Sequence, residues 1–97
     1  MRIIAKRRLR AFWEQHPEAE SALKAWHRDV VAARWTSPAD VKRSYVTASI
    51  IGANRVVFNV RGNRYRIVVA LNYAYGIIYV RFVGTRAEYD AVDAVSV

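Results

Sequence analysis

The second half of the chain alternates apolar and polar residues with a period of two, and no other feature constrains the fold as strongly. Three runs between Val56 and Val83 alternate in this way, separated by Gly62-Asn63 and by the segment 72–76. A period of two is typical of β-strands, because successive side chains point to opposite faces of a sheet. Gly-Asn is a signal for a two-residue hairpin turn. The sequence therefore predicts three antiparallel strands in a meander.

The first half of the chain has a helical spacing instead. Apolar residues at 9, 12 and 13 predict a first helix that ends before Pro17, because proline forces the preceding residue out of the helical region. Pro17 suits the first turn of a second helix, whose apolar stripe runs from Ala19 to Ala33. Ser37 and the proline after it predict the cap and first turn of a short third helix that ends near Ser44.

A chain of 97 residues has the length of a single domain, and no linker or repeat divides it. Residues 2–5 are apolar enough for an edge strand or for the first turn of a helix. The apolar stripes of the helices and the apolar face of the strands each need a partner. We therefore expect one α+β domain over residues 1–97, with N-terminal helices packed on one face of a small antiparallel β-sheet. Ile78, Val80 and Phe82 are all expected on the helix-facing side.

Composition excludes several classes of protein. The chain has no cysteine, which excludes disulfide frameworks and thiolate metal sites, and only two histidines, so that a histidine-built metal site would have to be completed by carboxylates. The longest uncharged run, 67–80, falls short of the roughly 20 apolar residues of a membrane span. A basic cluster follows the first residues, where a signal peptide would need an apolar core. We expect a soluble, cytoplasmic protein without metal or cofactor and without a membrane partner.

The charge is strongly one-sided. Lysine and arginine total 16 against 8 acidic residues, for a net charge of +8, and 13 of the 16 are arginines. No aspartate or glutamate occurs between Ala48 and Ala87, the segment that holds the predicted strands. Arginine binds phosphate oxygens in pairs and stacks on bases. This distribution favours a nucleic acid or an acidic protein as partner over a basic surface that serves only solubility.

Strand parity places a specific set of residues on the sheet face away from the helices. The set is Val57, Asn59, Arg61, Arg64, Arg66, Ala70, Tyr79 and Arg81. Like charges on one face repel unless a ligand neutralises them, so we interpret this face as a phosphate-binding surface rather than a merely solvated one. RNA supplies its own 2′-hydroxyl nucleophile, so cleavage needs no metal, but it needs cations, a proton acceptor and a donor to the leaving 5′-oxygen. No histidine lies in the predicted strands to serve as the usual acid–base residue. The candidate groups are Arg66 and Arg81 for charge, Tyr79 and Tyr89 for hydrogen bonding or stacking, Glu88 as proton acceptor and Arg86 as a further cation.

Two long motifs carry a resemblance to a known family. The first runs from Val56 to Val69 and contains Val-Phe-Asn, then Gly-Asn, then an arginine at position 66. The second is Tyr-Val-Arg-Phe at 79–82 followed by Gly-Thr-Arg-Ala-Glu-Tyr-Asp at 84–90. Further matching segments lie in the first half, Ser37-Pro38-Ala39-Asp40 among them. Together these motifs resemble the HigB-type toxins of the RelE superfamily.

The resemblance implies a ribosome-dependent mRNA endonuclease of a type II toxin–antitoxin system. It also implies a cognate HigA-like antitoxin with a helix-turn-helix region, so that operator DNA is contacted only through the antitoxin. The catalytic residues it implies are Arg66, Tyr79, Arg81, Arg86, Glu88 and Tyr89. We expect RNA contacts from Asn59, Arg61, Arg64, Lys6 and Arg7.

Two departures from the family pattern concern the chemistry. Arg61 precedes the Gly-Asn turn where the family has glycine, and Arg86 stands where the family has histidine. Arginine binds phosphate but transfers protons poorly, because its pKa exceeds about 12. Alternatives therefore remain: a non-catalytic RNA- or ribosome-binding module, or a basic face that serves mainly to dock an acidic antitoxin segment.

Overall fold

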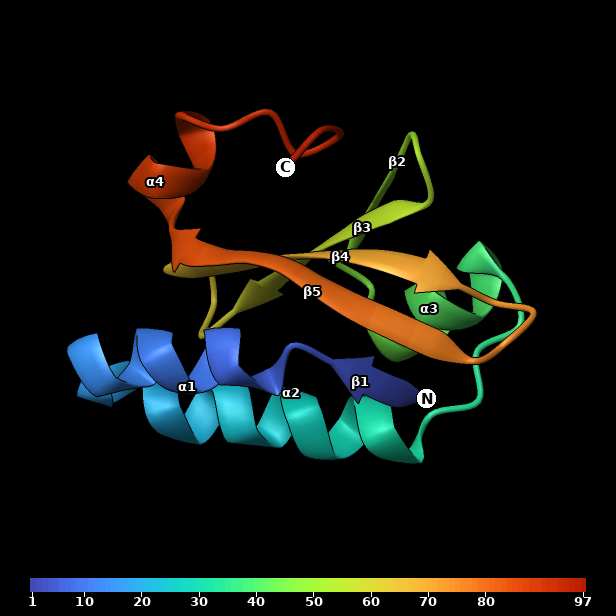
Figure 1. Cartoon of the computed structure of the whole chain (residues 1–97), viewed down its shortest axis with the longest axis horizontal. Helices are drawn as coiled ribbons and strands as arrows, with labels where there is room; N and C mark the ends of the chain where they lie inside the picture. The colour runs from blue at the N-terminus through green and yellow to red at the C-terminus, as the bar shows by residue number, and fades with distance from the viewer.

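Five strands form one sheet in the order β1-β5-β4-β3-β2 in the computed structural model, which describes residues 1–97 (Figure 1). The strands are β1 (Arg2–Ile4), β2 (Ser49–Ile51), β3 (Arg55–Val60), β4 (Tyr65–Asn72) and β5 (Ile77–Thr85). The β3–β4 and β4–β5 pairs are antiparallel, so the predicted meander is confirmed. β2 adds a further antiparallel strand and β1 pairs with β5 in parallel, which makes the sheet mixed. Of the two alternatives for residues 2–5, the strand is correct.

The helices lie on both sides of this sheet. They are α1 (Lys6–Gln15), the 3₁₀ turn η1 (Pro17–Ala19), α2 (Glu20–Ala32), α3 (Pro38–Ser44) and α4 (Arg86–Asp90). α1 and α2 cover one face, whereas α4 and the C-terminal segment lie on the opposite side (Figure 1). The Ser37 hydroxyl accepts a hydrogen bond from the Asp40 amide at 3.4 Å, as the predicted cap requires. The α+β class, with N-terminal helices on one sheet face, is confirmed. None of the helices is long and apolar enough to cross a membrane.

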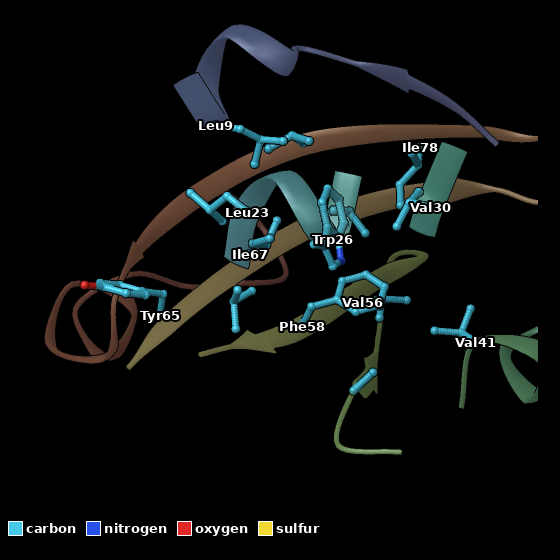
Figure 2. Packing of buried hydrophobic residues seen from close by; sticks show 14 of the residues in the cluster. Leu9, Leu23, Trp26, Val30, Val41, Val56, Phe58, Tyr65, Ile67 and Ile78 are labelled. Atoms are coloured by element: carbon cyan, nitrogen blue, oxygen red, sulfur yellow. The ribbon is translucent and has the colours of Figure 1, made fainter. Parts of the chain in front are cut away.

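The core lies between α1, α2 and the sheet, and Phe58 is at its centre (Figure 2). Phe58 is fully buried. Its ring stacks on Trp35, with ring centroids 5.9 Å apart, and meets the edges of Trp26 and Tyr45 at 5.4 and 5.2 Å. Aromatic clusters of this kind bury large apolar areas and fix the relative positions of the elements that contribute them. Phe58 therefore ties β3 to α2 and to the segment around α3.

The hairpin between β3 and β4 is wider than predicted. Val60 pairs with Tyr65, so the connection has four residues, with Gly62 and Asn63 at its centre. Arg61 and Gly62 both have positive φ, 54° and 66°. The left-handed backbone takes Arg61 out of the strand, and its Nη1 donates to the Glu18 carbonyl oxygen of η1 at 3.3 Å. The prediction that Arg61 lies on the face away from the helices is therefore wrong.

A β-bulge interrupts the β4–β5 ladder. Val68 pairs with Phe82 and Val69 with Val80, so Arg81 has no partner of its own. The extra residue reverses the alternation beyond it, because two residues of β5 then face one of β4. Val83 packs against the core and Phe82 shares a face with Val68. The expected place of Phe82 beside Ile78 and Val80 is therefore wrong.

Tyr65 connects this hairpin to the helices. It is 4% exposed, and its hydroxyl donates to Glu18 Oε1 at 2.6 Å. Its ring meets the edge of Phe12 at 5.4 Å. The hydrogen bond from Tyr65 is the main reason that the pKa of the Glu18 carboxyl lies below its ordinary value of 4.5. A carboxylate with a lowered pKa stabilises the fold above its unfolded pKa, and this contribution is lost as the pH falls.

We predict that Tyr65→Phe lowers the free energy of unfolding at pH 7 and that this effect shrinks as the pH falls below about 4.5. Urea unfolding at pH 7 and at pH 3.5 measures both differences. Tyr75→Phe is the matched control, since Tyr75 is 79% exposed and its hydroxyl makes no hydrogen bond. A Tyr65→Phe deficit that is equal at the two pH values would contradict the role of the ionised Glu18.

Candidate nucleic-acid interface

The face of the sheet turned away from α1 and α2, called the outer face below, is apolar in its middle. Val57 and Val68 pair there and are 3% and 0% exposed, although neither belongs to the core beneath. The C-terminal segment, residues 91–97, lies on this side of the sheet (Figure 1). The middle of the outer face is therefore not the continuous phosphate-binding surface that parity predicts.

Two arginines hold the C-terminal segment in place. Arg55 Nη2 and Arg81 Nε donate to the Val97 carbonyl oxygen at 3.1 and 3.3 Å. A carbonyl with two lone pairs accepts both bonds. The sequence gives no signal for this contact, because residues 94–97 are small and uncharged apart from their backbone. Arg81 thus lies on the outer side of the sheet, as predicted, but its guanidinium turns toward Val97.

The end of the outer face next to α4 is polar. Asn59, Arg66 and Gly84 form one row across β3, β4 and β5. The Arg66 guanidinium lies 5.9 Å from the centre of the Tyr89 ring, within the range of a cation–π contact. Its Nη1 also donates to the Asn63 carbonyl oxygen at 3.0 Å. The predicted residues Asn59, Arg66 and Tyr89 therefore lie at one end of the sheet.

A capping box fixes α4 beside this row. The Thr85 hydroxyl accepts from the Glu88 amide at 3.2 Å, and Glu88 Oε1 accepts from the Thr85 amide at 2.8 Å. The Arg86 amide donates to the Arg64 carbonyl oxygen at 3.1 Å, which joins α4 to the β3–β4 hairpin. Arg64, Arg86 and Glu88 are all exposed. Glu88 thus has a structural role, and its second carboxylate oxygen makes no hydrogen bond within the protein.

Four other predicted site residues lie away from the end of the sheet next to α4. Tyr79 pairs with Ala70, four ladder positions from the Arg66 row, or roughly 13 Å along the strands. Arg61 faces η1. Lys6 and Arg7 are exposed in the first turn of α1, and the charge of Lys6, after the larger effect of burial, lowers the pKa of His27. None of these four side chains lies near Arg66 and α4, so the structure does not support their predicted roles in RNA contact or catalysis.

A cavity of roughly 420 Å³ opens between α1, β5 and α4. Arg81, Phe82 and Glu88 line it together with Arg8, a residue that sequence reasoning did not select. Arg8 Nη1 lies 3.5 Å from the Arg81 carbonyl oxygen. The helical spacing marks Arg8 only as a solvent-facing residue, and its approach to β5 depends on tertiary packing. A larger cavity of about 620 Å³, near α2 and α3, contains none of the predicted site residues.

The arginines near α4 have no acidic partner. The ion pairs within 4.0 Å join His16 to Glu18, Lys24 to Glu20 and Arg43 to Asp40. Arg64, Arg66, Arg81 and Arg86 form no ion pair with an aspartate or glutamate side chain. No group of three or more histidine or acidic residues gathers where it could hold a metal ion. This end of the molecule is therefore suited to an anionic ligand.

A family model matches most of the chain. Residues 19–92 match the family model for the HigB toxin, described as a RelE-like toxic component of a toxin–antitoxin system. The match spans α2 to α4, with the whole β2–β5 part of the sheet, and leaves α1 outside. The chain belongs to the HigB toxin family, as the resemblance predicted. It is thus the toxin of a toxin–antitoxin system, and such a system implies an antitoxin partner. No curated protein matches the chain.

Gly84 is the point at which α4 packs against the sheet. A Cβ atom at this position would lie 2.5 Å from the Phe82 ring and 3.2 Å from the Glu88 Cβ. We predict that Gly84→Ala destabilises the protein by about 1 kcal/mol, at the low end of overpacking costs, because the ring must move. Urea unfolding measures the change. Gly52→Ala is the control, since nothing lies within 4 Å of its Cβ position. Equal stability of the two variants would show that Phe82 does not constrain Gly84.

Proposed function

We propose that the chain is an endoribonuclease that cuts mRNA on the ribosome, without metal, by attack of the 2′-hydroxyl on the adjacent phosphate. The observation that supports this function best is the group of arginines without acidic partners around α4, next to Tyr89 and Glu88. Membership of the HigB toxin family supports it independently. The partners we infer are the ribosome and mRNA, and a HigA-like antitoxin through which operator DNA is reached.

The reaction forms a bond between the 2′-oxygen and phosphorus and breaks the bond to the 5′-oxygen, which leaves a 2′,3′-cyclic phosphate. The 2′-proton must be accepted and the 5′-oxygen must receive a proton. Negative charge accumulates on the phosphate oxygens, and preorganised cations stabilise it strongly in a site that excludes water. The protein must therefore supply cations and a means of proton transfer.

Arg66 and Arg81 are the cations that we place at the phosphate. Tyr89 holds the Arg66 guanidinium by its ring, which fixes the direction of the charge. Arg81 is held less firmly, by one bond to the Val97 carbonyl at 3.3 Å. A phosphate offers Arg81 several charged oxygens at once, which a guanidinium can bind in pairs. RNA binding is therefore expected to draw Arg81 away from Val97.

We assign Glu88 to accept the 2′-proton and Tyr89 to donate a proton to the leaving 5′-oxygen. Glu88 keeps one carboxylate oxygen free while the other caps α4, so the carboxylate is both positioned and available. Arg86, at the start of α4, stands where the family has histidine and adds charge but no proton exchange. Tyr79 lies too far along β5 to join this group in the structure as it stands, so its proposed part is contact with RNA beyond the cleaved bond.

The second candidate function is a ribosome-binding module that does not cut. Arg86 is the observation that favours it, because an arginine in place of the family's histidine removes the usual proton donor. The two functions differ in one result. A nuclease leaves new 5′ ends on mRNA that primer extension detects, whereas a non-cutting binder stalls translation and leaves the mRNA whole.

We predict that Arg81→Ala lowers the single-turnover cleavage rate on mRNA-programmed ribosomes about 10²–10³-fold, the usual cost of losing a preorganised charge donor. Antitoxin binding and the urea midpoint should stay close to wild type, because Arg81 is exposed and Arg55 keeps its own, shorter bond to Val97. Arg28→Ala is the charge-matched control, an exposed arginine on α2, which covers the opposite face of the sheet. Wild-type cleavage rates in folded Arg81→Ala would remove this residue from the mechanism. Intact mRNA with the wild-type chain would favour the non-cutting binder.

A further inference from the structure

The cavity beside β5 has one wall from α1 that the proposed mechanism does not use. Arg8 and Gln15 lie in that wall, Phe82 and Arg81 lie opposite, and Glu88 contributes from α4. α1 and α4 approach the same end of β5 from the two sides of the sheet (Figure 1). The volume of roughly 420 Å³ is within the range of small-molecule sites, about 300–1,000 Å³. The cavity is therefore large enough for one nucleotide.

Arg8 is an unpaired cation at this position. The edge of β5 is open here, because β1 ends at Ile4, opposite Tyr79. The only hydrogen bond of the Arg8 side chain is the 3.5 Å contact to the Arg81 carbonyl, and no carboxylate lies within 4.0 Å. A guanidinium has five N–H donors, so most of those of Arg8 are free. Free paired donors of this kind fit two oxygens of a phosphate.

Phe82 and Gln15 supply features that suit a base. The bulge at Arg81 turns Phe82 to the outer face, where its ring is only partly buried and lies over Gly84. Aromatic rings on a protein surface stack on unpaired bases, which is the usual way in which single-stranded RNA is held. Gln15 is exposed at the end of α1 and can both donate to and accept from a base edge.

We propose that this cavity binds one nucleotide of single-stranded RNA, next to the phosphodiester that Arg66 and Arg81 address, with Arg8 on its phosphate and Phe82 against its base. The inference rests on the proposed function for the identity of the ligand. An acidic protein segment would use the Arg8 charge but not the Phe82 ring, on which an unpaired base can stack, so the lining favours a nucleotide.

The test compares Arg8→Ala with Arg10→Ala in the full chain, since Arg10 is exposed on α1 but does not line the cavity. Three quantities are measured: the affinity for ribosomes programmed with a short mRNA, at several salt concentrations, single-turnover cleavage of that mRNA, and the affinity for the antitoxin. Arg8→Ala should bind about tenfold more weakly and lose about one unit of the slope of log affinity against log salt, as expected for one phosphate contact. Arg10→Ala should match the wild type in both affinity and cleavage, and Arg8→Lys should recover part of the affinity.

A second arm tests the base. An abasic residue is placed in the mRNA on either side of the cleaved bond in turn, and one of the two should weaken wild-type binding about tenfold, because stacking is lost. Equal affinity of Arg8→Ala and wild type for programmed ribosomes would overturn the subsite. A loss confined to antitoxin binding would overturn it as well and assign the cavity to the protein partner. If the wild-type chain leaves mRNA intact, the cleavage proposal fails while the binding comparison still decides on the subsite.

Discussion

The register between β4 and β5 is the constraint on which the rest of this structure depends. These strands form the longest ladder of the sheet, and one extra residue, Arg81, divides it into two parts with opposite parity. Before the bulge, Ile78 and Val80 face the helices. Beyond it, Val83 faces them, whereas Phe82 and Gly84 face α4. Without the bulge, the Phe82 side chain would enter the core between the sheet and the helices. Gly84, which lets α4 approach the sheet, would then face α1 and α2 instead of α4.

The same register places charge where the fold can tolerate it. The core beneath the sheet contains no buried charged residue, and its apolar side chains provide the driving force for folding. The unpaired arginines gather instead at the hairpin, the bulge and the first residue of α4, where water or a ligand can reach them. Such a concentration of one sign destabilises a folded chain by self-repulsion. We interpret this concentration of positive charge as an adaptation for binding an anionic ligand, as the proposed function requires.

Most of the fold could be predicted from the sequence because its signals are local. The helical spacing of residues 9–13, the cap at Ser37 and the alternation in β3, β4 and the first part of β5 each depend on neighbours in the chain. The bulge at Arg81 could not be predicted, because the alternation of residues 78–83 in the sequence continues through Arg81 without a break. The left-handed backbone at Arg61 could not be predicted either, because the turn signal specifies Gly62 and Asn63 but not the residue before them.

The candidate site divides in the same way. Arg66, Arg86, Glu88 and Tyr89 were found from strand parity and from the family motif, and the structure brings them to one end of the sheet. Arg8 lies more than 70 residues before Arg81 in the sequence, yet it contacts the Arg81 carbonyl oxygen. The segment on the outer side of the sheet, residues 91–97, is the last part of the chain. Neither segment has a local pattern that predicts the contact, because each position depends on how distant elements pack.

In the proposed function, the arginines around α4 act on RNA through the RNA's own 2′-hydroxyl. The most direct measurement replaces that hydroxyl by hydrogen at the single nucleotide whose 3′ phosphate is cut, in mRNA bound to the ribosome. The account predicts that the wild-type chain still binds these programmed ribosomes, that cleavage at this bond disappears, and that unmodified mRNA yields a 2′,3′-cyclic phosphate. Undiminished cleavage at the deoxy position would contradict it, because the nucleophile would then have to come from elsewhere.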